Sequence, residues 1–212
     1  NVLNNILRGN SGNNTLTGQD GDDKLFGNGG DDTLDGGNGA DYLNGGDGHD
    51  AMSGGDGDDI YVVDSTSDTV TENSSQGTDL IYSSVSFTAS ADVENLNLTG
   101  SNNIDATGNV LNNILRGNSG NNTLTGGDGN DKLFGNNGTN TLIGGNGADY
   151  LNGGAGDDAM SGGDGNDIYV IDSTSDTVTE NSSEGTDLII SSVSFTASAD
   201  VENLTLTGSN NI

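Results

Sequence analysis

The chain has 212 residues and carries 33 acidic but only 4 basic side chains, a formal net charge of −29. Such an excess of negative charge argues against nucleic acid or an anionic membrane as a partner, because both are bound through basic surfaces. Apolar residues make up 29% of the chain and aromatic residues 4%. This composition indicates either disorder or a fold in which bound metal ions replace part of a hydrophobic core. Cysteine is absent, which excludes disulfides and thiolate metal sites.

A long sequence repeat divides the chain into two copies. Residues 1–108 form the first copy and residues 109–212 the second, and 91 of the 104 aligned positions are identical. We expect each copy to be one structural unit, with short repeats at 9–62 and 117–170 and longer coils at 63–108 and 171–212. Near-identical copies of this length are typical of a segment from a longer tandem array.

A nine-residue repeat fills the first half of each copy. Its blocks begin at Gly9, Gly18, Gly27, Gly36, Gly45 and Gly54, and again at Gly117, Gly126, Gly135, Gly144, Gly153 and Gly162. Place four is always glycine, place six is Asp or Asn, and place eight is apolar, as in Leu25. Because so much glycine disfavours a helix and suits turns, the pattern predicts a six-residue turn followed by a three-residue strand with place eight pointing inward.

Successive strands should alternate between two sheets, so that each block stacks on the block 18 residues away. The place-six carboxylates of neighbouring coils, such as Asp23 and Asp41, would then lie about 4.8 Å apart. Such pairs repel when empty and suit a hard dication with 6–8 oxygen ligands, which favours calcium over magnesium. Zinc is disfavoured because the chain has no cysteine and one histidine.

The blocks Gly36–Asn44 and Gly54–Val62 resemble the calcium-binding nonapeptide of the RTX (repeats-in-toxin) family. The resemblance covers twelve blocks, and the segments 59–64, 68–72 and 93–100 are similar to the longer coils of that family. It implies an all-β fold, a right-handed parallel β-roll or β-solenoid, with several Ca²⁺ ions per copy bound between stacked turns.

The resemblance also implies the ligands. One turn gives the carbonyls of places two and four and its place-six Asp, and the turn 18 residues later gives the carbonyls of places one and three and its own Asp. The first copy then has three sites: Gln19, Gly21 and Asp23 with Gly36, Asn38 and Asp41; Asn28, Gly30 and Asp32 with Gly45, Asp47 and Asp50; and Gly37, Gly39 and Asp41 with Gly54, Asp56 and Asp59. The second copy has two: Gly127, Gly129 and Asp131 with Gly144, Asn146 and Asp149; and Gly145, Gly147 and Asp149 with Gly162, Asp164 and Asp167. Asp158 is a further metal candidate.

Three blocks depart from this pattern at place six, where they carry Asn14, Asn122 and Asn140. An amide oxygen can ligate calcium but brings no charge, so we expect fewer or weaker sites in the second copy.

Other acidic side chains lie outside place six of the pattern. Those at place five (Asp22, Asp31 and Asp58) are expected to face solvent. Asp64, Glu72 and Asp79 form either an extra calcium site in the longer coil or an exposed edge. An EF-hand is excluded, because the spacing lacks the closing glutamate and flanking helices.

The chain carries no catalytic motif, and nothing indicates a catalytic role for His49, so we expect a structural protein and not an enzyme. The favoured function is a calcium-rigidified extracellular rod in a secreted bacterial protein, such as an adhesin stalk, surface layer or filament. Alternatives are the C-terminal calcium-dependent module of a secreted enzyme or toxin and, less favoured, an ice-binding solenoid. Expected partners are calcium and neighbouring repeats, with end-to-end self-association possible at open solenoid ends; the resemblance implies type I secretion.

Overall fold

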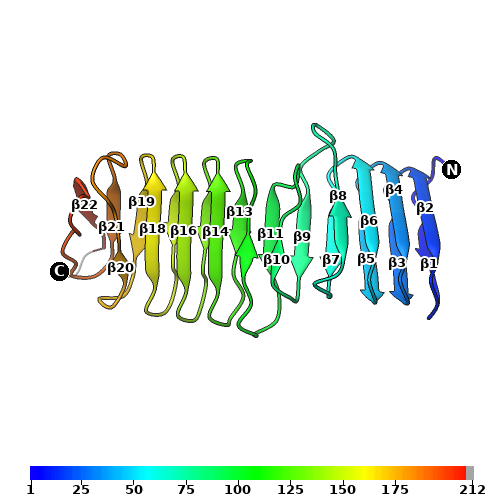
Figure 1. Ribbon diagram of the computed structural model, residues 1–212, viewed down its shortest axis with the longest axis horizontal. Helices are drawn as coiled ribbons and strands as arrows, with labels where there is room; N and C mark the ends of the chain where they lie inside the picture. Colours follow the sequence, from blue (N-terminus) through cyan, green and yellow to red (C-terminus); the bar gives the residue numbers. More distant parts are fainter. Residues whose placement is uncertain (209–212) are drawn as a thin grey trace. The chain divides into compact units, whose positions relative to one another are not determined.

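The chain forms two compact units, Asn1–Asn97 and Leu98–Ile212, of which the structure, a computed structural model, describes residues 1–208. Every regular element in the described residues is a β-strand (Figure 1). Within residues 1–208 there is accordingly no helix with the length and hydropathy needed to cross a membrane.

The N-terminal unit is a β-solenoid of parallel strands. Its strands are β1 (Ile6–Arg8), β2 (Thr15–Asp20), β3 (Lys24–Gly29), β4 (Thr33–Asn38), β5 (Tyr42–Asp47), β6 (Ala51–Asp56), β7 (Ile60–Val63), β8 (Thr69–Thr71), β9 (Leu80–Ser83), β10 (Phe87–Thr88) and β11 (Asn95–Leu98). One sheet has the order β1-β3-β5-β7-β9-β11 and the other the order β2-β4-β6-β8. From β1 to β9, successive strands therefore alternate between two sheets, as predicted.

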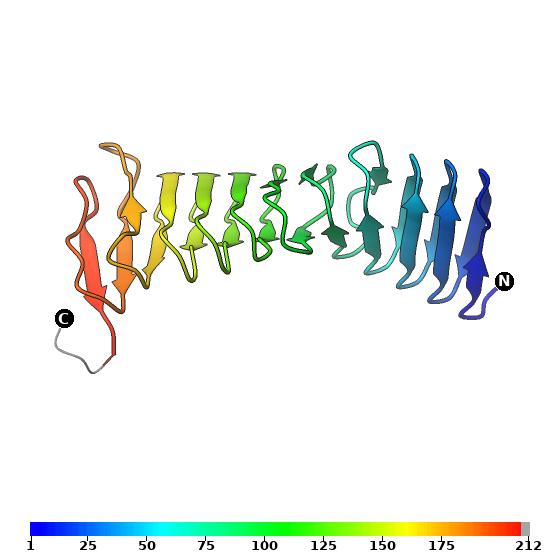
Figure 2. The ribbon, with the colours of Figure 1, turned by 90° about the horizontal axis from the view of Figure 1, so that it is seen from below.

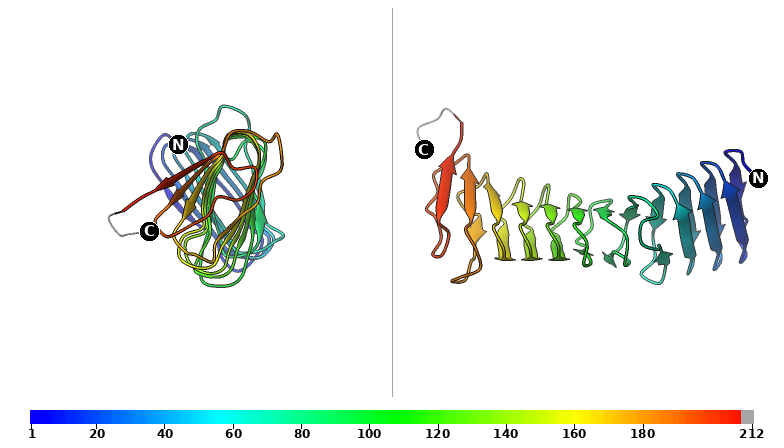
Figure 3. Two further views of the ribbon diagram at one scale, coloured as in Figure 1. Left: turned by 90° about the vertical axis from the view of Figure 1, so that its left-hand side faces the viewer. Right: turned by 90° about the horizontal axis from the view of Figure 1, so that it is seen from above.

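The C-terminal unit repeats this arrangement. Its strands are β12 (Ala106–Thr107), β13 (Ile114–Arg116), β14 (Thr123–Asp128), β15 (Lys132–Phe134), β16 (Thr141–Asn146), β17 (Tyr150–Asn152), β18 (Ala159–Asp164), β19 (Ile168–Ile171), β20 (Thr177–Val178), β21 (Leu188–Ser191) and β22 (Asn203–Leu206). One sheet has the order β13-β15-β17-β19-β21-β22 and the other β12-β14-β16-β18-β20. Within each unit the strands of successive coils lie side by side (Figure 2), and in the end-on view of Figure 3 they lie one behind another.

The register confirms the predicted 18-residue coil. Leu7 pairs with Leu25 and Leu25 with Leu43, in parallel ladders. The coil lengthens only after the nonapeptides, where Ile60 pairs with Leu80. Place eight points inward as expected, and its side chains form a narrow buried column in each unit: Leu25, Leu34, Leu43, Met52 and Tyr61, and Leu133, Leu142, Leu151, Met160 and Tyr169.

The predicted three-residue strand is too short for most nonapeptide coils. β2 contains places seven to nine of one block and also places one to three of the next. Its ladder with β4 passes over Gly18 and resumes with Gln19 opposite Gly37 and Asp20 opposite Asn38. Because the chain has no proline, the backbone N–H groups of the turn are free to extend the ladder. Places four to six then make the actual turn.

Candidate calcium-binding turns

The place-six aspartates of neighbouring coils are linked by hydrogen bonds. The backbone N–H of Asp23 donates to Asp41 Oδ1 at 2.6 Å, and that of Asp41 donates to Asp59 Oδ1 at 2.7 Å. In the C-terminal unit the N–H of Asp131 donates to Asp149 Oδ1 at 2.7 Å. These bonds orient each carboxylate and fix which of its oxygens faces the inside of the turn.

The second oxygen of these carboxylates is buried and has no hydrogen-bond partner within residues 1–208. This holds for Oδ2 of Asp23, Asp32, Asp41, Asp50, Asp59, Asp131, Asp149, Asp158 and Asp167. Each of these side chains is at most 2% exposed. An ionised oxygen that has lost both water and a partner is strongly destabilising unless a cation takes the place of the water. The turns therefore present a regular series of buried carboxylate oxygens that a cation would stabilise.

Backbone carbonyls surround the unpaired oxygens. A Cβ atom added to Gly18 would overlap both Asp23 Oδ2 and the carbonyl oxygen of Gly36, so these two oxygens are close neighbours. The carbonyls of Gln19 and Gly21 point from the same turn at Gly37 and Gly39 of the next coil. Only glycine at place one leaves room for this arrangement.

The same juxtaposition of an Asp Oδ2 with the place-one carbonyl of the next coil recurs at each predicted pair of turns. It is found at Gly27 (Asp32 with Gly45), Gly36 (Asp41 with Gly54), Gly126 (Asp131 with Gly144) and Gly144 (Asp149 with Gly162). At Gly153, Asp158 Oδ2 takes the corresponding position. The structure thus places the predicted carboxylates and place-one carbonyls together.

The predicted place-three carbonyls have an additional role, because each accepts a hydrogen bond from the previous coil. Gly21 N donates to Asn38 O at 2.8 Å and Gly39 N donates to Asp56 O at 2.6 Å. The carbonyls of Asp47, Asn146 and Asp164 accept equivalent bonds from Gly30, Gly129 and Gly147. A carbonyl oxygen has two lone pairs, so these groups retain one for a cation.

Place two has a left-handed backbone in every block except the first of each copy, which sequence reasoning missed. Gly37 has φ 110°, and Gln19 and Asn28, which replace glycine at this place, have φ 85° and 77°. A residue with a Cβ atom adopts this conformation at a cost. The repeated glycine at place two was the signal that could have revealed it.

Burial raises the pKa of several place-six carboxylates above the ordinary value. Burial, with Asp41 and Glu72 nearby, raises the pKa of Asp59 to about 8. Burial and the charge of Asp131 raise the pKa of Asp149 to about 7. Burial is likewise the main reason that the pKa of Asp41 rises to about 6. The turns therefore disfavour carboxylate charge until a cation neutralises it.

Asn140 fills its turn with its own amide group. Its Nδ2 donates to the carbonyls of Asn137, Gly138 and Gly153 at 3.3, 3.5 and 3.5 Å, while its Oδ1 accepts the backbone N–H of Asn122 at 2.9 Å. The amide N–H groups thus face the carbonyls that would otherwise face a cation. The sequence-based expectation, an amide oxygen acting as a weak ligand, does not describe this turn.

Place five carries a second ladder of hydrogen bonds. Asp22, Asp31 and Asp58 are exposed, as predicted. Their Oδ1 atoms accept the backbone N–H groups of Ala40, His49 and Thr78 in the next coil, at 3.1, 3.1 and 2.9 Å. The recurrence of Asp and Asn at this place was the sequence signal for this ladder, which runs opposite to the place-six ladder.

Of the expected trio Asp64, Glu72 and Asp79, the structure brings together only Glu72 and Asp79, and the third carboxylate beside them is Asp59. Asp64 is exposed just beyond β7, whereas Glu72 and Asp79 are buried near Asp59. The interpretation as an exposed edge is therefore wrong for Glu72 and Asp79.

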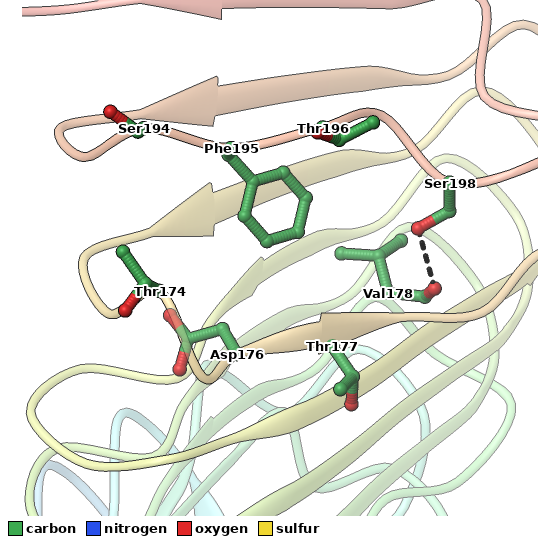
Figure 4. A pocket seen from close by; sticks show the side chains of 8 residues that line it. All are labelled: Thr174, Asp176, Thr177, Val178, Ser194, Phe195, Thr196 and Ser198. Carbon is green, nitrogen blue, oxygen red and sulfur yellow. Dashed lines mark hydrogen bonds between the residues drawn. The ribbon is translucent and has the colours of Figure 1, made fainter. Parts of the chain in front are cut away.

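An open hollow in the C-terminal unit lies between β20 and the segment 194–198, with Phe195 over it (Figure 4). Ser198 Oγ donates across it to the carbonyl of Val178 at 2.8 Å. The carboxylate of Asp176 accepts the backbone N–H groups of Asp158, Asp172 and Ser173. Because this carboxylate is already satisfied, the hollow lacks the unpaired oxygen that marks the turns.

The model of the RTX calcium-binding nonapeptide repeat matches residues 2–34, 26–61, 35–70, 107–142 and 134–169, more than half of the chain. The chain belongs to the RTX calcium-binding nonapeptide repeat family. No curated protein matches the chain. RTX repeats bind Ca²⁺, and the donors of these turns, unpaired carboxylate oxygens beside backbone carbonyls, are the hard oxygen ligands that calcium prefers.

Proposed function

We propose that the chain is a calcium-dependent structural segment of a secreted bacterial protein, folded and stiffened by calcium outside the cell. The observation that carries this proposal is the series of buried, unpaired Asp Oδ2 atoms along the stacked turns. The thin apolar column contributes one side chain per nine residues, so cation binding has to supply much of the folding free energy.

The five pairs of turns predicted from the sequence are the proposed calcium sites. Each pairs a buried carboxylate with a place-one carbonyl of the next coil, and Asp158 is a further candidate ligand. Asn140 supplies its own donors, which supports fewer sites in the second copy than in the first.

Calcium concentration then acts as the folding signal. At low cytosolic calcium the buried carboxylates repel one another and oppose folding, which suits export of an unfolded chain. At millimolar calcium outside the cell, sites with dissociation constants of about 10⁻⁴–10⁻³ M fill, and their binding energy becomes folding energy.

The long duplication favours an extended repeat role, such as an adhesin stalk, surface layer or filament. With 91 of 104 aligned residues identical, the copies form a pattern that can be lengthened by whole units. A calcium-dependent module of a secreted enzyme or toxin is the second candidate, because RTX repeats alone do not distinguish the two roles. In neither role does the chain itself act as an enzyme.

Circular dichroism and small-angle scattering test the proposal. We expect EDTA to abolish the β signal and calcium to restore it, and we expect the longest dimension in calcium to double when two chains are joined in tandem. A chain that keeps its full β signal in EDTA, or a tandem that is no longer than the single chain, would refute it.

A further inference from the structure

Three buried carboxylates gather where the nonapeptides of each copy give way to the longer coils. In the N-terminal unit they belong to Asp59, Glu72 and Asp79, and in the C-terminal unit to Asp167, Glu180 and Asp187. In each group the carboxylate oxygens lie within 4.8 Å of one another. These groups lie at the end of the nonapeptide stack and include a glutamate that the repeat pattern does not contain.

Glu72 lies where the regular coils have a place-one glycine. β6 and β8 pair Ala51 with Thr69 and Ser53 with Thr71, so Glu72 follows in register with Gly54. One coil earlier, the carbonyl of Gly54 adjoins Asp41 Oδ2. At the end of the stack, a carboxylate side chain therefore takes over from a backbone carbonyl.

A tyrosine positions the glutamate. The N–H of Gly54 donates to Tyr61 Oη at 2.5 Å, and the Tyr61 hydroxyl donates to Glu72 Oε1. Asp59 is 1% exposed and Glu72 is 7% exposed. For Asp59 Oδ2 and Glu72 Oε2, no hydrogen-bond partner exists in the part of the chain that the structure describes. Two oxygens are thus buried and unpaired at one point.

The second copy has the corresponding tyrosine and buried glutamate, but among the described residues its glutamate accepts no hydrogen bond from the tyrosine. Gly162 N donates to Tyr169 Oη at 2.5 Å, and Glu180 is 8% exposed. Among residues 1–208 neither carboxylate oxygen of Glu180 has a hydrogen-bond partner, and the same is true of Asp167 Oδ2. The arrangement is therefore a repeated feature of the long coil.

The chain supplies no positive charge for these groups. Its four basic side chains, Arg8, Lys24, Arg116 and Lys132, are exposed on β1, β3, β13 and β15. Three converging carboxylates without a basic partner suit a hard dication. Calcium accepts several carboxylate ligands, whereas magnesium usually takes one or two and keeps several waters, so the ligand set favours calcium.

The last aspartate of the neighbouring stack, Asp68, is held by backbone N–H groups. Asp68 Oδ1 accepts the N–H of Asp50 at 3.1 Å, and its Oδ2 accepts the N–H groups of Asp64 and Ser65 at 3.2 and 3.1 Å. Backbone donors therefore satisfy both oxygens of the last aspartate there. The two stacks therefore end differently: backbone N–H groups satisfy both oxygens of Asp68, whereas Asp59 Oδ2 and Glu72 Oε2 have no hydrogen-bond partner among the described residues.

We propose that Asp59, Glu72 and Asp79, and likewise Asp167, Glu180 and Asp187, each hold one calcium ion that closes the nonapeptide stack where the long coil begins. This inference rests on the proposed function, since calcium must reach and fold the chain. It adds a type of site with a glutamate ligand and a tyrosine neighbour.

Equilibrium dialysis of the full chain against calcium tests the proposal. We expect Glu72→Gln and Glu180→Gln each to lower the number of bound ions by one, and the double variant to lower it by two. Asp58→Asn is the matched control: it removes one charge from the adjacent turn, installs the residue found in the second copy (Asn166), and should leave the number unchanged. An unchanged number in the double variant would overturn the inference.

Terbium provides a second readout that keeps the glutamates. Tb³⁺ bound at these sites should be excited through Tyr61 and Tyr169, so Tyr61→Phe with Tyr169→Phe should remove at least half of the tyrosine-sensitised emission. Unchanged emission would overturn the inference even if the glutamate variants failed to fold. A wild-type chain that binds no calcium would instead refute the proposed function.

Discussion

Replacing Asn140 by aspartate should create a calcium site in the second copy. The amide Nδ2 now donates to the carbonyls of Asn137, Gly138 and Gly153 at 3.3–3.5 Å. Asn140→Asp exchanges these long hydrogen bonds for an ionised oxygen beside the same carbonyls. It also restores the residue found at the aligned position, Asp32. The turn would then have the composition of the predicted sites.

The size of the effect follows from mass action. For a dissociation constant of 10⁻⁴–10⁻³ M, 10 mM calcium exceeds it by about 10- to 100-fold and stabilises the folded state by about 1.4–2.7 kcal/mol. At about 2–4 °C per kcal/mol for a chain of this size, the midpoint of thermal unfolding should rise by about 3–11 °C. At limiting calcium the sign reverses, because the variant buries one more uncompensated charge.

Calcium titration and thermal unfolding followed by circular dichroism measure both effects. The variant should bind one more ion than the wild type, and Asp32→Asn should bind one fewer. Asp22→Asn, which introduces the second copy's Asn130 at an exposed position, should do neither. If Asn140→Asp neither binds an additional ion nor steepens the calcium dependence of the unfolding midpoint, the reasoning about this turn is wrong.

Three further predictions concern the turns. Gly36→Ala should weaken calcium binding at least tenfold, because the added Cβ would overlap the Asp41 carboxylate and the carbonyl oxygen of Gly54. Gly12→Ala, where the nearest atom to the added Cβ is 3.4 Å away, should leave the affinity unchanged. Equal calcium affinities of the two variants by calorimetry would contradict this prediction. Gln19→Gly should raise the free energy of unfolding in calcium by about 1 kcal/mol, since Gln19 has φ 85°; a lower unfolding midpoint would count against it. Burial raises the pKa of Asp59 to about 8 and of Asp149 to about 7. Without calcium, protonation of these carboxyls therefore stabilises the folded state fully below the ordinary pKa near 4, and this contribution is lost as pH rises through 7–8. Calcium needs the ionised form, so its affinity should fall as pH drops from 8 to 6, and titrations with pH-independent affinity would contradict the assignment.

The regular part of the fold could be predicted because the nine-residue period leaves few alternatives. It fixes an 18-residue coil, points Leu25 inward and stacks Asp23 on Asp41, as the register and hydrogen bonds show. The ladder bonds that extend each strand into the turn were not predictable from the period, because they depend on backbone geometry. The same holds for the direction in which the Asn140 amide points.

The carboxylate pairing in the long coils could not be predicted, because these coils differ in length from the nonapeptide coils. Beyond Asp59 the coil lengthens to 20 residues, and Asp59 N donates to Asp79 Oδ1. Counting by 18 therefore misses this pair. It also left Asp64 as a candidate, although the structure places Asp64 on the exposed side.

The place-five ladder has a consequence for how copies of the protein meet one another. Asp22 and Asp58 accept the same backbone hydrogen bonds as Asn130 and Asn166 at the aligned positions. Charged and neutral side chains therefore serve equally well in this ladder. The outward charge, and with it the electrostatic repulsion between neighbouring chains in a crowded or salty medium, can change one residue at a time while the coil beneath keeps its register.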